Sequence, residues 1–579
     1  MSWPSPSYVS SNKLLPPVAM NVGSTDTVGG ARSTDVLNLP VVRVRRKKGK
    51  WQVNFENWLT NDGKYFDPRS NGPSYIFLGL WIAGNVAQFG YTFNFYNSNP
   101  SFSNFRTMLG ITLPLARGAA SCIDLSAGII LLPVCRNLLS LLRNTPIQRY
   151  VPVDRNIDFH RFLGWSVVLW SFVHSVAHMF NLLNLSRYQV GLVKPETVAV
   201  TSGPGATGQI LVVLLFLIVT ASIYTVRRKF FEIFWFTHHL FIVFFAILLT
   251  HGTFCFIQTN NGSCAGAAFW KYWVFFGGLY LLERIVRELR GRLPTNISKV
   301  VMHPSRVCEV QIRKPSCKIR SGQYIFLCCP QVAGYEWHPF TLTSAPEEDF
   351  ISVHIRVAGD WTTAFAKQVG CQWDDRGNPS KTLEAAVGND ARLVLPRVMV
   401  DGPYGAASED VFNYEVSVCF GAGIGVTPFA SMLKSIWYKV KNPTKVIPLR
   451  KVYFYWICRD KDAFEWFQDL LVALEEEDLG KFLEIELYIT GSLKPNEVFN
   501  VILNDEEGIK DGLTGLKSAT KFGRPNLDAI FKSLGERHPH TDCGVFFCGP
   551  KPLNAMLHAC CNKYTQTDGT RFYYHKENF

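Results

Sequence analysis

The sequence lacks several motifs that would assign it to a common class. None of its 15 cysteines forms a CxxC pair or another zinc-type spacing, which argues against a cysteine-based zinc domain. No D-x-[DN]-x-[DN]-G loop is present, so calcium binding by EF-hands is not supported. There is no internal repeat. The first 70 residues contain no long apolar run, so we expect no cleavable signal peptide.

Long apolar runs are concentrated in the first half of the chain. Six stretches are long enough to cross a bilayer core of about 30 Å, near residues 74–96, 109–135, 161–183, 208–226, 231–254 and 267–286. The alternative is a soluble protein with six buried helices. At 579 residues the chain also has room for several domains.

The formal net charge is +13, and the positions of the basic residues indicate a membrane topology. Basic residues gather in alternate gaps: RVRRKKGK at 43–50; Arg136, Arg143, Arg149 and Arg155; Arg227, Arg228 and Lys229; and Arg284, Arg287, Arg290 and Arg292. The other gaps hold only Arg106, Arg187 and Lys194. Lys and Arg mark cytoplasmic loops, so we expect both termini and the long C-terminal half in the cytosol, and no nucleic-acid partner.

Four residues are expected on the opposite side of the membrane. Cys255 and Cys264 lie in the short segment after the fifth span and can form a disulfide there, whereas most cysteines should stay reduced. Asn184 and Asn261 begin glycosylation sequons. Residues 1–73 are expected to form a mostly disordered cytosolic tail, since they are rich in Ser, Pro, Val and Gly and have weak periodicity.

Six histidines fall in the spans: His160, His174, His178, His238, His239 and His251. Polar side chains in hydrocarbon are costly and usually functional, although a single histidine often only bonds two helices together. His160 and His174 are 14 residues apart, about 21 Å along a helix and about 40° short of four full turns. Both therefore face one side at two depths, as ligands of two stacked haems would.

The fifth span fits this scheme less well. His238 and His251 differ by about 220° on an ideal helix, so a rewound helix or different haem orientations must absorb the mismatch. Pairing by depth gives an inner haem on His160 and His238 and an outer haem on His174 and His251. Spacing alone leaves His239 open as the alternative to His238. His178 lies one turn beyond His174 and is expected near the outer haem without binding iron.

The C-terminal half carries nucleotide-binding signals. Thr341, Ser344 and Arg356 offer donors and a cation that suit a flavin. An apolar strand at 414–420 leads to Gly421, Gly423 and Gly425 and then to a helix, which suits a pyrophosphate although the glycines do not follow G-x-G-x-x-G. A second strand ends at Arg459, placed for a 2′-phosphate, and a third ends in Cys548, Gly549 and Pro550.

Several motifs together resemble the NADPH oxidase family, and its phagocyte-type flavocytochrome b heavy chains most. They are LLPVCRNLLSLLR, FWFTHHLF, HPFTLTSAP, HIRVAGDWT, FGAGIGVTPFASMLKSIWYK, YFYWICRD, FGRPN, FFCGP and the terminal KENF. The likeness covers residue 74 to the end. It implies six transmembrane helices with two b haems at 74–290, a ferredoxin-reductase-like FAD-binding β-barrel at 291–403 and an NADPH-binding α/β domain at 404–579.

The resemblance also implies roles for individual residues. The haem ligands become His160 and His238 (inner) and His174 and His251 (outer). An oxygen-reducing pair falls on Arg117 and His178, although Arg117 could instead pair with a haem propionate or Asp124. FAD residues are His338, Pro339, Phe340, Thr341, His354, Arg356, Thr362 and the stacking Phe579. NADPH residues are Gly421, Gly423, Gly425, Thr427, Pro428, Arg459, Arg524, Cys548, Gly549 and Pro550.

Two departures from the family pattern bear on function. The N-terminal tail of about 70 residues is additional, and the outer segment from Gly252 to about Gly266 is short and lacks histidine, which favours superoxide over peroxide. Regulated relatives imply a small membrane partner subunit, cytosolic organiser and activator proteins and a small GTPase, in the plasma membrane or an endomembrane.

The expected activity is transfer of electrons from NADPH through FAD and two haems to oxygen, which gives superoxide. A metalloreductase is the nearest alternative, but no outward Asp, Glu or Met cluster suggests a metal substrate. A proton channel would need titratable histidines and would leave the FAD and NADPH motifs unused. A catalytically silent scaffold is disfavoured by the intact glycine and histidine motifs.

Overall fold

The computed structural model describes residues 72–189, 194–264, 266–379, 395–441, 448–477, 479, 482–491, 511, 513–566 and 569–577. Nearly all of the expected N-terminal tail, and Phe579, therefore lie outside the described residues. The described chain forms two compact units, a helical unit up to Val286 and a second unit from Arg287 onward.

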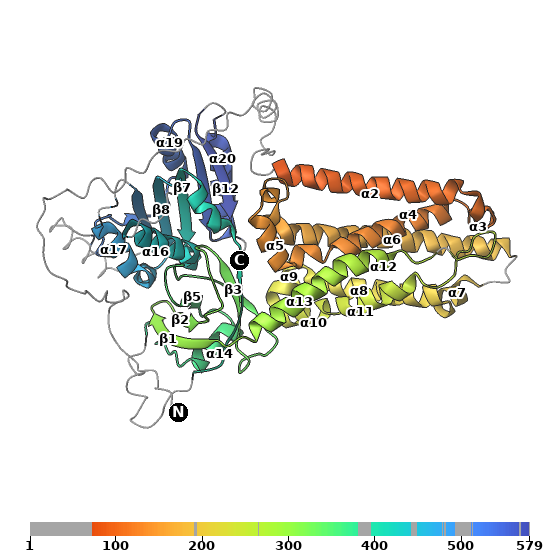
Figure 1. The fold of residues 1–579 in the computed structure, drawn as a ribbon, viewed down its shortest axis with the longest axis horizontal. Coiled ribbons are helices and arrows are strands. Elements are labelled where there is room, and N and C mark those ends of the chain that lie inside the picture. The colour runs from red at the N-terminus through yellow and green to blue at the C-terminus, as the bar shows by residue number, and fades with distance from the viewer. Residues whose placement is uncertain are drawn as a thin grey trace, which may run out of the picture. The chain divides into compact units, whose positions relative to one another are not determined.

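The helical unit begins with α2 (Gly72–Ser98), η1 (Pro100–Phe102), α3 (Ser103–Leu109), α4 (Thr112–Ile129) and η2 (Leu132–Val134). It continues with α5 (Arg136–Arg143), η3 (Pro146–Arg149), η4 (Val153–Arg155), α6 (Asn156–Tyr188), α7 (Pro195–Thr201), α8 (Gly203–Ser222), α9 (Tyr224–Lys229), α10 (Phe231–His238) and α11 (Phe241–His251). The α4 helix packs against both α2 and α6, and α8 packs against α10 and α11. Figure 1 shows these long helices running side by side.

Within the described ranges, five helices are long and apolar enough to cross a membrane: Ser74–Ser98, Thr112–Val134, Val153–Tyr188, Gly203–Ser222 and Phe231–His251. Their outer faces carry large apolar side chains, among them Ile76, Leu80, Phe172 and Phe216, each about two-thirds exposed. A water-soluble bundle rarely exposes so much apolar surface, whereas lipid covers it naturally. The exposed apolar side chains favour membrane-spanning helices over the alternative of a soluble protein with six buried helices.

The sixth expected span is helical but differs from the other five. It consists of α12 (Phe269–Tyr272), a π-helical turn η5 (Trp273–Gly277) and the first part of α13 (Gly278–Gly291). Lys271, Glu283 and Arg284 interrupt its apolar character. Glu283 is buried and accepts a hydrogen bond from the Asn137 N–H at 2.8 Å. The sixth crossing stays a prediction.

The second unit begins with two three-stranded antiparallel sheets that share one apolar core. One sheet has the order β1 (Asn296–His303), β2 (Val307–Arg313), β5 (Ile351–Arg356). The other has the order β4 (His338–Thr341), β3 (Tyr324–Cys328), β6 (Met399–Tyr404). Helix α14 (Asp360–Gln368) follows β5, and its Trp361, Phe365 and Ala366 enter the same core. This arrangement matches the expected flavin-type barrel.

The remainder is a six-stranded parallel sheet of order β10-β9-β8-β7-β11-β12. The strands are β7 (Val416–Ala422), β8 (Lys451–Cys458), β9 (Leu483–Ile489), β10 (Lys521–Phe522), β11 (Asp542–Cys548) and β12 (Arg571–Lys576). The chain enters through η6 (Ala407–Asn413), and η7 (Gly423–Val426) and η8 (Lys461–Trp466) follow β7 and β8. Helices α16 (Thr427–Lys441) and α17 (Gln468–Glu476) cover one face, and α19 (Leu527–Arg537) and α20 (Lys551–Tyr564) cover the other (Figure 1).

Candidate redox-cofactor sites

Two pairs of histidines face each other inside the helical unit. The ring centroids of His160 and His238 lie 6.2 Å apart, and those of His174 and His251 lie 6.3 Å apart. Two imidazole nitrogens on opposite sides of one metal ion lie about 4 Å apart, because each metal–imidazole bond is about 2 Å, and the ring centroids lie farther out. Both separations therefore fit a pair of axial imidazoles on one iron.

Hydrogen bonds fix the orientation of all four rings. The Nδ1 atoms of His160 and His174 lie 2.9 Å from the carbonyl oxygens of Ile130 and Ala116. A carbonyl oxygen only accepts, so these two nitrogens carry hydrogen and each Nε2 keeps its lone pair. This is the tautomer that a metal ligand needs.

The other two rings reach the same tautomer through hydroxyl groups. Thr207 Oγ1 donates to the Gly203 carbonyl at 2.7 Å and lies 2.8 Å from His251 Nδ1. Ser222 Oγ likewise donates to the Ile218 carbonyl at 2.6 Å and lies 3.2 Å from His238 Nδ1. A hydroxyl has one proton, and when it is directed to the backbone carbonyl, the histidine Nδ1–H is the donor.

A break in the fifth span explains how its histidines reach this geometry. Helix α10 ends at His238 and α11 begins at Phe241. Between them, Leu240 N donates to Thr237 O and Ile242 N donates to His239 O, both at 3.1 Å, in the tighter i→i−3 pattern. This turn supplies the rotation that an ideal helix lacks. It also favours His238 over His239, whose exposed ring bonds to the Trp235 carbonyl at 2.7 Å.

A polar cluster lies next to His174. The His178 ring centroid lies 4.5 Å from that of His174, and His178 Nδ1 lies 3.4 Å from Asn181 Nδ2. Arg117 donates to the Tyr96 hydroxyl at 2.9 Å and lies over the Tyr96 ring. Within the described residues, Arg117 forms no ion pair with Asp124. Arg117 directly follows Ala116, whose carbonyl binds His174, and His178 lies beside the same ring.

The two sequons have different surroundings. Asn184 is part of α6 and is half-buried, and its amide donates to the Leu109 carbonyl at 2.9 Å. Asn261 is exposed, in the turn closed by the disulfide between Cys255 and Cys264. A glycan acceptor must be accessible, so Asn261 is the better candidate.

The expected flavin residues divide into a surface group and a buried group. His338 stacks on Trp361 with ring centroids 4.1 Å apart, and Phe340 lies next to the same ring at 6.0 Å. Pro339 is exposed beside them, and exposed Arg356 ends β5, whereas Thr341 at the end of β4 is buried. Thr362 Oγ1 accepts hydrogen bonds from the Ala358 and Gly359 amides, which shapes the start of α14. These residues fit a flavin with a pyrophosphate near Arg356.

The side chains of Ser344 and His354 are instead buried and have partners inside the protein. Ser344 Oγ accepts from Ser352 N at 3.0 Å, and its carbonyl accepts from Ser431 Oγ at 2.6 Å. The His354 ring packs on His303 and Phe467 and lies 2.9 Å from Thr343 Oγ1. Their side chains therefore support the site from within, and sequence motifs could not distinguish this from direct contact.

The glycine-bearing turn lies where a parallel sheet binds a dinucleotide. Successive strands go to opposite sides of β7, so the sheet's switch point lies between β7 and β11. A Cβ added at Gly425 would lie 2.3 Å from the Cys548 carbonyl oxygen, so only glycine fits this close approach. Gly423 has φ +56°. Gly421 lies at the end of β7, and a Cβ there would lie 3.1 Å from Val426 Cα. Thr427 and Pro428 open α16, and Gly549 and Pro550 lead into α20.

Arg459 and Arg524 are exposed residues that follow β8 and β10 at this same edge. Gly491 was missed from the sequence: a Cβ there would lie 2.2 Å from the Arg459 carbonyl oxygen. Its position two residues after a buried strand was the available signal. The cradle at this edge fits a bound dinucleotide.

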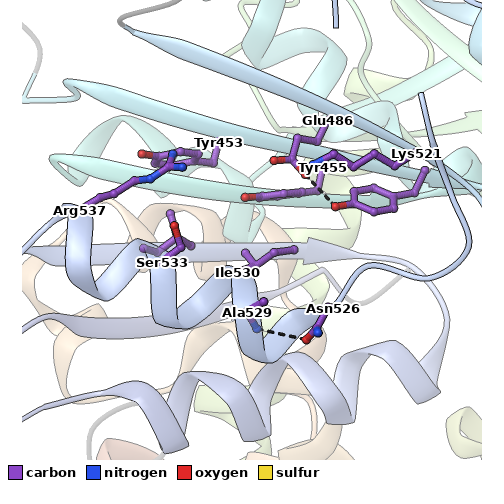
Figure 2. A pocket seen from close by; sticks show the side chains of 11 residues that line it. Tyr453, Tyr455, Glu486, Lys521, Asn526, Ala529, Ile530, Ser533 and Arg537 are labelled. Carbon is purple, nitrogen blue, oxygen red and sulfur yellow. Dashed lines mark hydrogen bonds and ion pairs between the residues drawn. The ribbon is translucent and has the colours of Figure 1, made fainter. Parts of the chain in front are cut away.

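A separate pocket of about 250 Å³ lies between the sheet and α19. Figure 2 shows Tyr453 and Tyr455 of β8 facing Ile530 and Ser533 of α19. Its basic residues already have partners: Lys521 with Glu486 at 2.8 Å and Arg537 with Glu484 at 3.1 Å. The glycine turn does not contribute to its lining, so the pocket is distinct from the expected pyrophosphate position.

Two carboxylates that hold the second unit together were also missed. Asp401 accepts from Arg287 Nε at 2.8 Å, Arg290 Nη2 at 2.6 Å and the Tyr404 hydroxyl at 2.6 Å. Glu577 is buried and accepts from both the N–H and the hydroxyl of Ser408 at 2.6 Å. Nothing in the local sequence marks either carboxylate as buried, because most of their partners are more than 100 residues away.

Three family models match the chain in order. The ferric reductase like transmembrane component matches residues 118–249, an FAD-binding domain matches 292–408, and the ferric reductase NAD binding domain matches 414–562. The matched membrane component and the apolar helices make the chain an integral membrane protein with FAD- and NAD(P)H-binding domains.

Curated relatives align over nearly the whole chain. A superoxide-generating NADPH oxidase heavy chain of Dictyostelium discoideum is 41% identical, over 88% of this chain and 97% of that protein. NADPH oxidase 1 of Rattus norvegicus is 39% identical, over 92% of this chain and 100% of that protein. NADPH oxidase 3 of Homo sapiens is 38% identical, over 90% and 99%. Given this identity across both units, the chain belongs to the NADPH oxidase family.

Proposed function

We propose that this chain oxidises NADPH in the cytosol and reduces molecular oxygen to superoxide at the opposite face of the membrane. One relative is named a superoxide-generating NADPH oxidase heavy chain, and another NADPH oxidase 1. The observation that best supports the proposal is the pair of facing histidine couples, held in one tautomer, in the same chain as a dinucleotide-type parallel sheet. When bound, NADPH supplies a hydride, FAD takes two electrons and releases them singly, and haem carries single electrons.

In this scheme the four histidines would hold the two haems. We assign the inner haem to His160 and His238 and the outer haem to His174 and His251. Each Nδ1–H is held by a backbone carbonyl or a hydroxyl, so each Nε2 lone pair is available and aimed. The same bonds disfavour a proton channel, because these rings are not free to exchange protons.

Oxygen would be reduced near Arg117 and His178. His174 and His251 would hold the outer haem as its ligands, so oxygen would be reduced beside the cofactor, where Arg117 and His178 lie. The Arg117 guanidinium, held by Tyr96, supplies a fixed positive charge for the anion that forms. His178 lies beside His174 and adds a hydrogen-bonding group at the same place.

On the cytosolic side, Arg356 would hold the flavin pyrophosphate, with His338, Pro339, Phe340, Thr341 and Thr362 around the cofactor. Phe579 would stack on the flavin ring. The turn from Gly421 to Gly425 would cradle the NADPH pyrophosphate beside Cys548, Gly549 and Pro550. Arg459 and Arg524 would bind the 2′-phosphate end.

The remaining parts of the proposal concern setting and partners. We place both termini in the cytosol, in the plasma membrane or an endomembrane. By family likeness, a small membrane subunit, cytosolic organiser and activator proteins and a small GTPase would control activity. Superoxide is favoured over peroxide because the outer segment between Gly252 and Gly266 is short and contains no histidine.

Ferric ion reduction is the second candidate, since two matching family models carry the ferric reductase name. Purified full-length protein with added FAD and NADPH separates the two. The proposal predicts a low-spin haem spectrum and NADPH oxidation matched by superoxide-dependent cytochrome c reduction. Turnover that needs an added ferric chelate would instead establish the reductase, and absence of haem would contradict both.

A further inference from the structure

Three ionisable residues come together on one face of the β1-β2-β5 sheet. Glu309 of β2 lies directly opposite His354 of β5, and opposite Val301 of β1. His303 is two residues beyond Val301, so it shares that face and lies diagonal to Glu309. The sheet register alone therefore brings two imidazoles and a carboxylate together.

The cluster is almost completely buried. The exposed fractions are 7% for His303, 1% for Glu309 and 5% for His354. One ligand-type atom from each residue lies within 4.8 Å of the other two. His303 Nε2 is 3.9 Å from Glu309 Oε2, and the two imidazole rings stack with centroids 5.2 Å apart.

One atom in this cluster has no hydrogen-bond partner. In the described part of the chain, His303 Nε2 is buried and makes no hydrogen bond, and its distance from Glu309 is too long for one. Buried polar atoms are normally satisfied, so an orphaned imidazole nitrogen that faces a buried carboxylate needs an explanation. A bound cation between them provides one.

The neighbouring side chains support the cluster as they do at metal sites. Gln311 Nε2 donates to Glu309 Oε1 at 3.1 Å, and Thr343 Oγ1 lies 2.9 Å from His354 Nδ1. These two partners orient the ligand side chains and leave the opposite atom free for a metal. Trp373 Nε1 donates to the His303 carbonyl at 2.8 Å and fixes the backbone there.

We propose that His303, Glu309 and His354 bind one divalent transition-metal ion, and that zinc fits the set best. Two imidazoles and one carboxylate are a zinc-type donor set, with a fourth position left for water. Ligand atoms around tetrahedral zinc lie about 3.4 Å apart, so the side chains would close slightly on binding.

Such an ion would brace the junction between the flavin-type barrel and the NADPH-binding part. Trp466 Nε1 donates to the Pro304 carbonyl at 2.9 Å, next to His303. Phe467 packs on the His354 ring at 4.5 Å. The proposed role is structural, and the site differs from the haem, FAD and NADPH sites.

The test is metal analysis of the purified full-length protein. After chelator treatment, incubation with Zn²⁺ and desalting, the wild type should retain about one zinc per chain. His303→Ala and Glu309→Gln should each reduce bound zinc at least tenfold. His538→Ala is the matched control, because His538 bonds to Tyr453 outside the cluster, and it should retain zinc. Flavin content and the haem spectrum report whether each variant folds.

A stability readout makes the result independent of turnover. Zinc should raise the midpoint temperature of flavin release in the wild type and in His538→Ala, but not in Glu309→Gln, which preserves the side chain's size. A wild type that holds no zinc, manganese, cobalt, nickel or copper after incubation would overturn the proposal. So would equal zinc content in the wild type and the Glu309→Gln variant.

Discussion

At the scale of single residues, the proposed haem site depends on small polar neighbours as much as on the histidines. Thr207 and Ser222 sit in α8, where their hydroxyls bond to backbone carbonyls of their own helix. Serine and threonine do this in many membrane helices, so nothing in the sequence singles out these two. Only the packing of α8 against α10 and α11 shows that they also accept from His251 and His238.

Replacing Thr207 with Val should therefore weaken the outer haem. The change removes the acceptor for the His251 Nδ1–H and leaves that donor unsatisfied. We expect about a 10- to 100-fold loss in affinity for the outer haem, measured as haem per chain after dilution or competition. Thr207→Ser keeps a hydroxyl group and should retain the wild-type affinity for the outer haem. Thr220→Val is the control, since within the described residues the Thr220 hydroxyl bonds to the Phe216 and Leu217 carbonyls of its own helix and to no histidine. An equal loss there would contradict the assignment.

A substitution at Gly425 tests whether the turn after β7 belongs to the NADPH site. An alanine Cβ at Gly425 would lie 2.3 Å from the Cys548 carbonyl oxygen, so η7 must move away from the end of β11 where the pyrophosphate is expected. Gly425→Ala should raise the KM for NADPH at least tenfold while the haem spectrum stays unchanged. Gly535→Ala in α19 meets nothing within 4 Å and should leave the KM unchanged and slightly stabilise the helix. Unchanged KM in Gly425→Ala would remove this turn from the NADPH site.

At the scale of elements, the carboxylate of Asp401 joins the end of α13 to β6. Its partners are Arg287, Arg290 and Tyr404. Burial alone would raise the pKa of Asp401, but Arg287, the Tyr404 hydroxyl and Arg290 outweigh it and lower the pKa. The stabilisation is therefore complete above an aspartate's ordinary pKa and is lost only as pH falls through the lowered value.

Asp401→Asn should uncouple this junction. It leaves two guanidinium groups, largely buried, without their counter-charge, which costs about 3 kcal/mol or more. We expect the variant to release its flavin at a clearly lower temperature. The release is measured as the rise in flavin fluorescence on heating. Asp349→Asn is the control, because its pair with Arg313 is mostly exposed and should contribute little. Equal shifts in both variants would show that Asp401 is not the anchor.

Sequence periodicity predicted most elements and some of the site, for identifiable reasons. Apolar runs marked the spans, and buried strands followed by glycine marked β7 and β11, because both signals are local. The histidine spacing left a rewound helix open as one alternative for the fifth span, but not its place at His239 and Leu240. The π-helical turn at Trp273–Gly277 was not visible, since packing decides it. The burial of Ser344 and His354 was also hidden, because their partners lie on other strands and helices.

At the scale of the whole molecule, the two sequons test which face of the membrane each segment occupies. Asn261 is exposed in the turn closed by the Cys255–Cys264 disulfide, whereas Asn184 is held by the Leu109 carbonyl. In a eukaryotic host, Asn261→Gln should abolish a glycosidase-sensitive mobility shift. Asn184→Gln should leave that shift intact. A shift that depends on Asn184 would require α6 to end differently, and absence of any shift would question the predicted orientation.

The crossing of the paired imidazole rings has a magnetic consequence. The ring planes of His160 and His238 meet at 62°, and those of His174 and His251 at 68°. In low-spin ferric haem, parallel axial rings separate the energies of the two iron d orbitals that share the unpaired electron, whereas strongly crossed rings leave them close together. Frozen, oxidised protein should therefore give widely spread electron paramagnetic resonance signals, each with one very large g value, instead of the compact rhombic pattern of parallel ligands.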